Sequence, residues 1–314
     1  MTTNEPISER WPALPYAEWS QTLETLHLWT QIVGKIRLRQ TPWINHSWHV
    51  SLYVTPTGLT TGSVPYDRGL FQIDFDFLIH QLTIKTSTDK RVNIGLYPRS
   101  VASFYTEVLD TFRQLGIDIT IQGTPNELPD VIPFADDQVH QSYDAEMVGR
   151  FWQAIVRMYS VFVRFRAGYT GKCSPVHFFW GSFDLAVTRF SGRRAPLHPG
   201  GAPNLSARVM QEAYSHEVSS AGFWPGNAQF PEAAFYSYCY PTPADFGQQP
   251  VEPAGAYFHP EMGEFILPYE VVRQSAEPEQ ALLAFLQTTY DAAVSTAHWN
   301  RDELDCDLSS YEYQ

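Results

Sequence analysis

Cysteine, basic charge and long hydrophobic runs are scarce in this chain of 314 residues. Its three cysteines, Cys173, Cys239 and Cys306, lie far apart without CxxC spacing, which argues against a disulfide framework and a zinc knuckle. Lys and Arg number 21 against 34 Asp and Glu, and the net charge of -13 disfavours nucleic acid and anionic membranes as partners. No apolar run approaches membrane-spanning length, and no secretory signal is visible. We therefore expect a cytoplasmic protein.

Common catalytic motifs are also missing. No glycine-rich phosphate loop precedes a predicted helix, GxSxG is absent, and no cysteine has the context of a nucleophile. His216 and Glu217 are adjacent but do not form HExxH, because position 220 is Ser. The residues identify neither a cofactor nor an oligomeric state, and they leave the reaction class open.

Four amphipathic segments enclose two groups of β-prone runs. Helices are expected at the following positions: 16–39, 100–116, 144–166 and 278–299. In the first group, Phe71, Ile73 and Phe75 alternate with Gln72 and Asp74, which predicts one core face and one wet face. We predict an α+β fold of two similar halves, each an antiparallel β-meander flanked by helices. An internal duplication is one explanation, and two unrelated halves are the other.

Composition suggests where the halves divide. Residues 126–141 are rich in proline and acidic side chains, which is typical of a linker. An N-terminal half (1–125) would precede it, a C-terminal half (142–301) would follow, and an acidic tail would cover 302–314. Long irregular segments in the C-terminal half are typical of binding loops, so the candidate site is expected there.

The most informative stretch is HFFWGSFDLAVTRFSGRRAP, residues 177–196. It is either one long strand or a hairpin that turns near Gly181 and Ser182. Only a turn or bulge would bring His177 and Asp184 to the same side, where Asp184 could orient His177 as a general base.

The same stretch contains arginines that could bind an anion. Arg189, Arg193 and Arg194 could hold a carboxylate or phosphate through forked hydrogen bonds, with Trp180 nearby. The alternative is an Asp–Arg pair that braces neighbouring strands. Convergence of Asp184, Arg189 and His216 on one cavity would separate these readings.

Two further segments add candidates. SHEVSSAGFWPG offers His216 and Glu217 as a base and its orienting partner, small residues that permit close approach, and then Trp224. In FYSYCYPTP, Tyr236, Tyr238 and Tyr240 share one strand face and would form a stacking surface for a planar ring, a sugar or a cation. Packing under a loop is the alternative for these tyrosines.

Several of these segments together resemble a known family. They are HFFWGSFDLAVTRFSGRRAP, SHEVSSAGFWPG, FYSYCYPTP, LPYEVVR, the start Trp11-Pro12-Ala13-Leu14, and the GKIRL and GLTTG segments. With a closing helix that ends near Trp299, this set resembles a family of mainly bacterial proteins described only as a domain of unknown function. The resemblance covers nearly the whole chain. It implies kinship, and it brings no activity, cofactor or catalytic residue with it.

The leading hypothesis is a small-molecule-binding protein or enzyme. Its pocket would be lined by arginines and aromatics in the C-terminal half and would take a polar or anionic ligand. One alternative is a structural or partner-binding protein whose buried polar residues only brace the fold. Another is a metal-dependent enzyme that uses His177, His216 and Glu217, with His259 as a further ligand.

Overall fold

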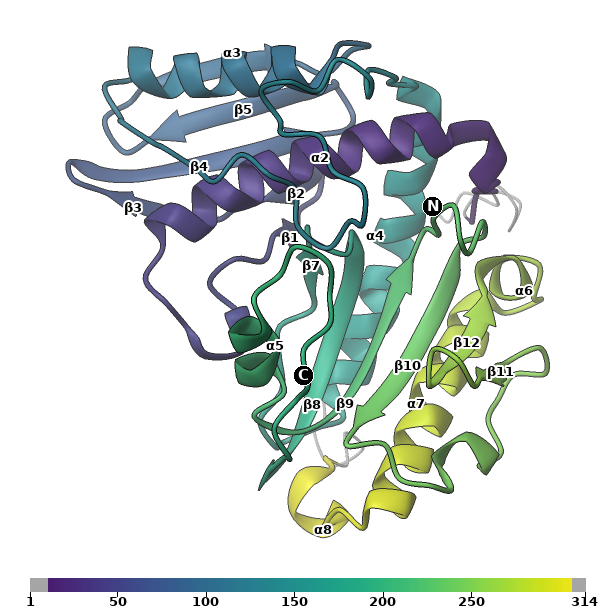
Figure 1. Ribbon diagram of the computed structural model, residues 1–314. Helices are drawn as coiled ribbons and strands as arrows, with labels where there is room; N and C mark the ends of the chain where they lie inside the picture. The colour runs from purple at the N-terminus through teal and green to yellow at the C-terminus, as the bar shows by residue number, and fades with distance from the viewer. Residues whose placement is uncertain (1–10, 307–314) are drawn as a thin grey trace, which may run out of the picture.

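The computed structural model describes residues 11–306 and confirms the α+β prediction (Figure 1). The described part contains seven α-helices and two antiparallel sheets of six strands each. Of the predicted acidic tail, residues 307–314 lie outside the described residues.

The elements follow in this order. The N-terminal part contains α2 (Tyr16–Gln40), η1 (Asn45–Ser47), β1 (Tyr53–Val54), β2 (Gly58–Thr60), β3 (Val64–Tyr66), β4 (Gly69–Asp76), β5 (Gln81–Thr86), β6 (Arg91–Gly95) and α3 (Val101–Gln114). The C-terminal part contains α4 (Ala145–Ala167), β7 (His177–Phe179), β8 (Asp184–Arg194), α5 (Ala207–Ala213), β9 (His216–Trp224), β10 (Ala234–Tyr240), η2 (Phe246–Gln248), β11 (Tyr257–His259), β12 (Glu264–Pro268), α6 (Tyr269–Arg273), α7 (Pro278–Ala297) and α8 (Arg301–Leu304). The four predicted helices are α2, α3, α4 and α7, and each bound agrees within two residues.

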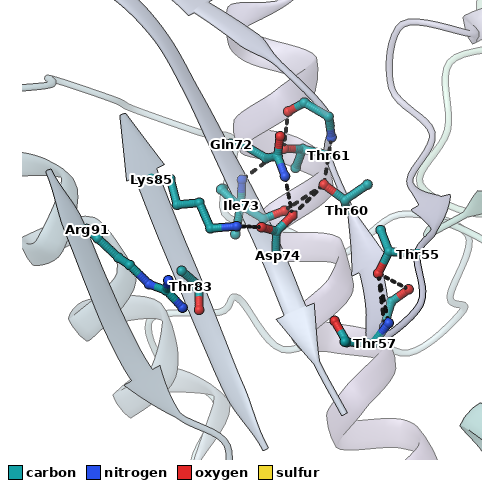
Figure 2. A network of polar contacts seen from close by, with 12 residues as sticks. Thr55, Thr57, Thr60, Thr61, Gln72, Ile73, Asp74, Thr83, Lys85 and Arg91 are labelled. Atoms are coloured by element: carbon teal, nitrogen blue, oxygen red, sulfur yellow. Dashed lines mark hydrogen bonds and ion pairs between the residues drawn. The ribbon is translucent and has the colours of Figure 1, made fainter. Parts of the chain in front are cut away.

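The N-terminal sheet has one core face and one wet face, as the alternation in β4 predicts. Its strand order is β1-β2-β4-β5-β6, with β3 also paired to β4. Phe71, Ile73 and Phe75 are buried in the core, where the Phe71 ring centroid lies 5.0 Å from that of Phe112 of α3. On the wet face, Asp74 accepts hydrogen bonds from Thr60 at 2.6 Å, Gln72 at 2.7 Å and Lys85 at 2.8 Å (Figure 2). These three hydrogen bonds satisfy the Asp74 carboxylate, so the polar network stabilises the sheet.

The C-terminal sheet separates two different environments. Its order is β11-β12-β10-β9-β8-β7, and α4 and α7 lie behind it while α5 lies in front (Figure 1). Leu185 and Val187 of β8, Phe223 of β9 and Phe235 of β10 are buried with α4 and α7 in the core. The other face carries the even-numbered residues of β8, β9 and β10, because side chains alternate along a strand.

The two sheets meet at their first strands. Leu52, just before β1, and Phe178 of β7 exchange two backbone hydrogen bonds of 2.8 Å each. In each part the opening and closing helices also pack together, α2 with α3 and α4 with α7. Duplication of the two halves stays a prediction.

The predicted linker packs against the fold. Residues 126–141 contain no helix or strand, yet Asp137 is buried and its carbonyl accepts from the Ala102 amide at 3.0 Å. His140 similarly accepts from the Val101 amide at 3.0 Å, so this segment satisfies the first turn of α3. The division into halves on either side of it stays a prediction. Within residues 11–306, no helix is both long and apolar enough to cross a membrane.

Gly34 of α2 provides a test of how the two parts pack. The Trp180 indole lies against it so closely that a Cβ atom on residue 34 would be 2.2 Å from Trp180 Cδ1. We expect Gly34→Ala to lower the free energy of unfolding by about 2 kcal/mol, because the indole would have to move. Urea unfolding measures this.

Gly149 of α4 is the matched control, because no atom would lie within 4 Å of an added Cβ there. Gly149→Ala should stabilise the protein by about 0.5 kcal/mol through helix propensity. Equal effects of the two substitutions would contradict the packing account.

Candidate functional site

The stretch 177–196 forms a hairpin, which decides between the two readings of the sequence. β7 and β8 pair antiparallel with Phe179 opposite Asp184 and His177 opposite Ala186. Phe183 in the turn has a left-handed φ of 58°. Paired residues point to the same face, so His177 and Asp184 lie on one side of the sheet as the hairpin reading requires.

A cavity of about 970 Å³ covers this face of the C-terminal sheet. Its floor consists of even-numbered strand residues: Asp184, Ala186, Thr188, Phe190, Val218, Ser220, Trp224, Tyr236, Tyr238 and Glu264. Its walls come from other segments: Lys35 of α2, Trp43, His46 and Trp48 around η1, Glu127, and residues of α5 with Tyr214. Both parts of the chain therefore build it, which corrects the expectation of a pocket within the C-terminal half.

Four of the predicted ligand-binding residues line this cavity. They are Trp180, Trp224, Tyr236 and Tyr238. The rings of Tyr236 and Tyr238 stack with centroids 6.1 Å apart at 18°, and the Tyr238 hydroxyl lies 2.8 Å from the Tyr214 hydroxyl. Trp180 is fixed by an Nε1 hydrogen bond of 2.8 Å to the Val50 carbonyl. Of the three tyrosines of this strand face, Tyr236 and Tyr238 line the cavity, whereas Tyr240 lies outside the lining and donates its hydroxyl hydrogen to the Pro196 carbonyl at 3.1 Å.

Arg189 does not line the cavity, and this corrects the predicted arginine lining. It lies five residues after Asp184 on the same strand, so the pleat directs it to the opposite face. It is 1% exposed, its guanidinium carbon lies 3.6 Å from the Phe165 ring centroid and 4.2 Å from that of Tyr290, and it donates to the Phe165 carbonyl at the end of α4. Arg189 is a brace between β8 and two helices.

Arg193 and Arg194 also lie outside the lining. A register shift between Phe190 and Arg194 interrupts the pairing of β8 with β9. Arg193 Nε donates to Glu217 Oε2 at 2.9 Å, and its Nη2 donates to the Ala297 carbonyl at 2.6 Å, at the C-terminal end of α7. Arg194 is exposed. The predicted anion clamp is therefore not assembled, and Glu217 is occupied by Arg193.

The histidine candidates do not form a catalytic pair or a metal site. His177 is 1% exposed, neither ring nitrogen has a hydrogen-bond partner, and burial lowers its pKa to about 3. His216 packs edge-on against His46 with ring centroids 6.0 Å apart. Residues 11–306 include no group of three or more His, Cys, Asp or Glu placed to hold a metal ion.

Gly222 makes the central polar contact of the floor possible. Tyr236 of β10 is paired with Gly222 of β9, and Gly222 is paired with Ala186 of β8, two residues from Asp184. A Cβ on Gly222 would be 2.3 Å from the Tyr236 hydroxyl. Because glycine leaves this space free, the Tyr236 ring crosses β9 and donates its hydroxyl hydrogen to Asp184 Oδ2.

Asp184 is desolvated and lacks a counter-charge. It is 6% exposed, and its Oδ1 has no hydrogen-bond partner. Burial, with a further contribution from the charge of Glu127, raises its pKa to about 7. Burial and the charge of Asp184 raise the pKa of Glu264 to about 7, and burial raises that of Glu127.

Such carboxyl groups have two chemical uses. In the ionised form they attract a cation or accept hydrogen bonds from a ligand. A carboxyl with a pKa near neutrality also exchanges protons readily, which suits general acid–base chemistry.

The profile of a Family of unknown function (DUF5996) matches residues 11–306. The chain belongs to this family. No match was found among curated proteins or among solved structures. Membership agrees with the resemblance drawn from the sequence motifs.

Several cavity residues of this family member were not predicted. Glu127 lies in the predicted linker, where its carboxylate accepts a hydrogen bond of 2.6 Å from the Ser182 hydroxyl and occupies the space that a side chain at Gly181 would fill. Glu264 carries no local signal beyond its place in a strand. The run WINHSWH, which includes Trp43 and Trp48, concentrates aromatics in a short loop and is the one signal that could have indicated a binding wall.

Arg189→Ala tests the bracing role of this side chain. We expect a loss of about 3 kcal/mol in the free energy of unfolding, because its packing and its hydrogen bond to α4 disappear. Arg194→Ala on the same strand should change stability by less than about 0.5 kcal/mol, because the side chain is exposed. Similar losses for both, measured by urea unfolding, would contradict the bracing role.

Asp184→Asn tests the desolvated carboxylate. The pKa of Asp184 is about 7 in the folded protein against 3.8 as its reference value, so the folded state binds more protons between these values. Its contribution to stability is present below pH 4 and is lost as pH rises through 7. The stability of the variant relative to wild type should therefore rise by about 3 kcal/mol between pH 4 and pH 8.

Urea unfolding across this pH range measures the difference. Asp136→Asn, at an exposed position, is the control and should follow the wild type. A difference between Asp184→Asn and wild type that is constant with pH would contradict the effect of burial.

Proposed function

We propose that this protein binds a small organic molecule in the cavity over the C-terminal sheet. The observation that carries the proposal is the cavity of about 970 Å³ with a stacked tyrosine floor and the unpaired Oδ1 of Asp184. Ligand sites combine a concave, largely aromatic lining with a few convergent polar groups. The ligand would place a ring or apolar body against the tyrosines and a polar group at Asp184.

The alternative of a structural protein explains some of the candidate residues but not Asp184. Arg189, Arg193 and Glu217 brace the fold, which supports the structural reading for these three alone. A bracing role leaves Asp184 unexplained, since its Oδ1 has no partner in the folded chain. A buried acceptor without a partner is costly unless something supplies the bond.

Thr188→Phe tests binding at this cavity. Thr188 is half-buried on the floor, where its hydroxyl lies 2.9 Å from that of Ser220, and a phenyl ring there would occupy ligand space. In native mass spectrometry of freshly purified protein, we expect wild type to carry a non-covalent small-molecule mass and Thr188→Phe to lack it.

Thr86→Phe is the control, because this half-buried strand threonine also shares a hydroxyl contact of 2.9 Å, with Thr88, and lies outside the cavity. It should retain the bound mass. The proposal fails if wild type carries no bound mass and no compound of a metabolite library raises its melting temperature.

A further inference from the structure

Four carboxylates line the cavity, and one of them, that of Glu212, accepts hydrogen bonds from the His46 amide at both of its oxygens. The other three are those of Asp184 on β8, Glu264 on β12 and Glu127 after the Pro125 turn. In the described part of the chain, no Lys, Arg or His nitrogen lies within 4.0 Å of these carboxylates in an ion pair. The charge of Glu127 contributes to the raised pKa of Asp184, and the charge of Asp184 contributes to the raised pKa of Glu264.

The one lysine and the one arginine of the lining do not neutralise this charge. Lys35 is 4% exposed, and its Nζ donates to Gln122 Oε1 at 3.1 Å and to Asn126 Oδ1, so amide oxygens occupy it. Arg208 lies on α5 and is exposed. The lining therefore holds four carboxylates against one lysine and one arginine, and among the described residues neither of these two cations forms an ion pair with them.

Aromatic faces surround the acidic groups. Tyr236 and Tyr238 are stacked side by side on the floor, and Trp224 at the end of β9 stacks on Phe230. The faces of tyrosine and tryptophan rings attract cations, and more strongly where water is excluded. Carboxylates and aromatic faces in one desolvated cavity favour a positively charged group over an anionic one.

We infer that the ligand of this cavity is an organic cation, an amine whose ammonium group binds between Asp184 and Glu264 while its ring or apolar body packs on Tyr236 and Tyr238. This inference rests on the proposed function and names its ligand class. The ammonium hydrogens supply the partner that Asp184 Oδ1 lacks in the folded chain. The net charge of -13 of the whole chain also favours the approach of a cation.

A matched set of probes tests the charge preference. Phenethylamine, 2-phenylethanol and phenylacetate share a ring and a two-carbon scaffold and end in a cationic, a neutral and an anionic group. With saturation-transfer NMR and calorimetry at millimolar concentration, we expect the amine to bind at least about tenfold more tightly than the alcohol and the acid to be rejected. Equal or tighter binding of the alcohol or the acid would overturn the inference.

Neutralising variants locate the binding group. Glu264→Gln and Asp184→Asn should each weaken phenethylamine binding by about tenfold or more and change 2-phenylethanol binding by less than about twofold. Glu261→Gln is the control, because it removes one negative charge at an exposed position three residues before Glu264. Equal weakening by Glu261→Gln would mean a non-specific charge effect and would overturn the inference.

The outcomes separate the inference from the proposed function. Binding of the alcohol or the acid that Thr188→Phe abolishes would refute the organic cation and leave small-molecule binding at this cavity intact. If none of the three probes binds, wild type carries no bound mass and no compound of the metabolite library raises its melting temperature, both fail. If none of them binds while wild type carries a bound mass, the identity of that mass decides: an amine supports the inference and a neutral or acidic compound overturns it.

Discussion

The pleat of strand β8 is the constraint on which the arrangement of this protein depends. Side chains of successive residues leave a strand on opposite faces, so Asp184 and Arg189 cannot share an environment. Asp184 faces the cavity, and Arg189 fills the space between the sheet and helices α4 and α7. The neighbouring strands therefore line a cavity on the Asp184 face and pack aromatic side chains on the Arg189 face.

Compensation of charge differs on the two faces. Arg189 lies against aromatic rings and donates to a helix-end carbonyl, although its buried Nε has no partner, and Arg193 is paired with Glu217. Asp184 receives one hydrogen bond, from Tyr236, and retains an oxygen without a partner. Evolution tolerates such a cost mainly where a ligand or a reaction uses the group. Other buried atoms, such as Arg189 Nε and both ring nitrogens of His177, also lack a partner, but among the described residues that line the cavity only Asp184 has such an atom.

Glycine positions allow elements that are distant in sequence to approach. Gly34 of α2 accepts the Trp180 indole, Gly222 lets a tyrosine cross a neighbouring strand, and Gly181 leaves room for Glu127. These contacts bring together the three elements that enclose the cavity, which are the opening helix, the segment after Pro125 and the C-terminal sheet. The cavity therefore belongs to the assembled chain, and neither sheet with its own helices would form it alone.

The sequence determined the α+β class, the four long helices, the wet face of the N-terminal sheet and the tyrosine ladder, because periodicity and turn chemistry are local properties. It also identified Trp180, Trp224 and Asp184 as candidate residues. Three-dimensional packing decided the rest: that the arginines brace the fold, that Glu127 and Glu264 join Asp184, and that the walls come from both parts of the chain. These features depend on which strands are neighbours in the sheet and on how far a side chain extends over the neighbouring strand. Such relations depend on long-range pairing, which no window along the sequence contains.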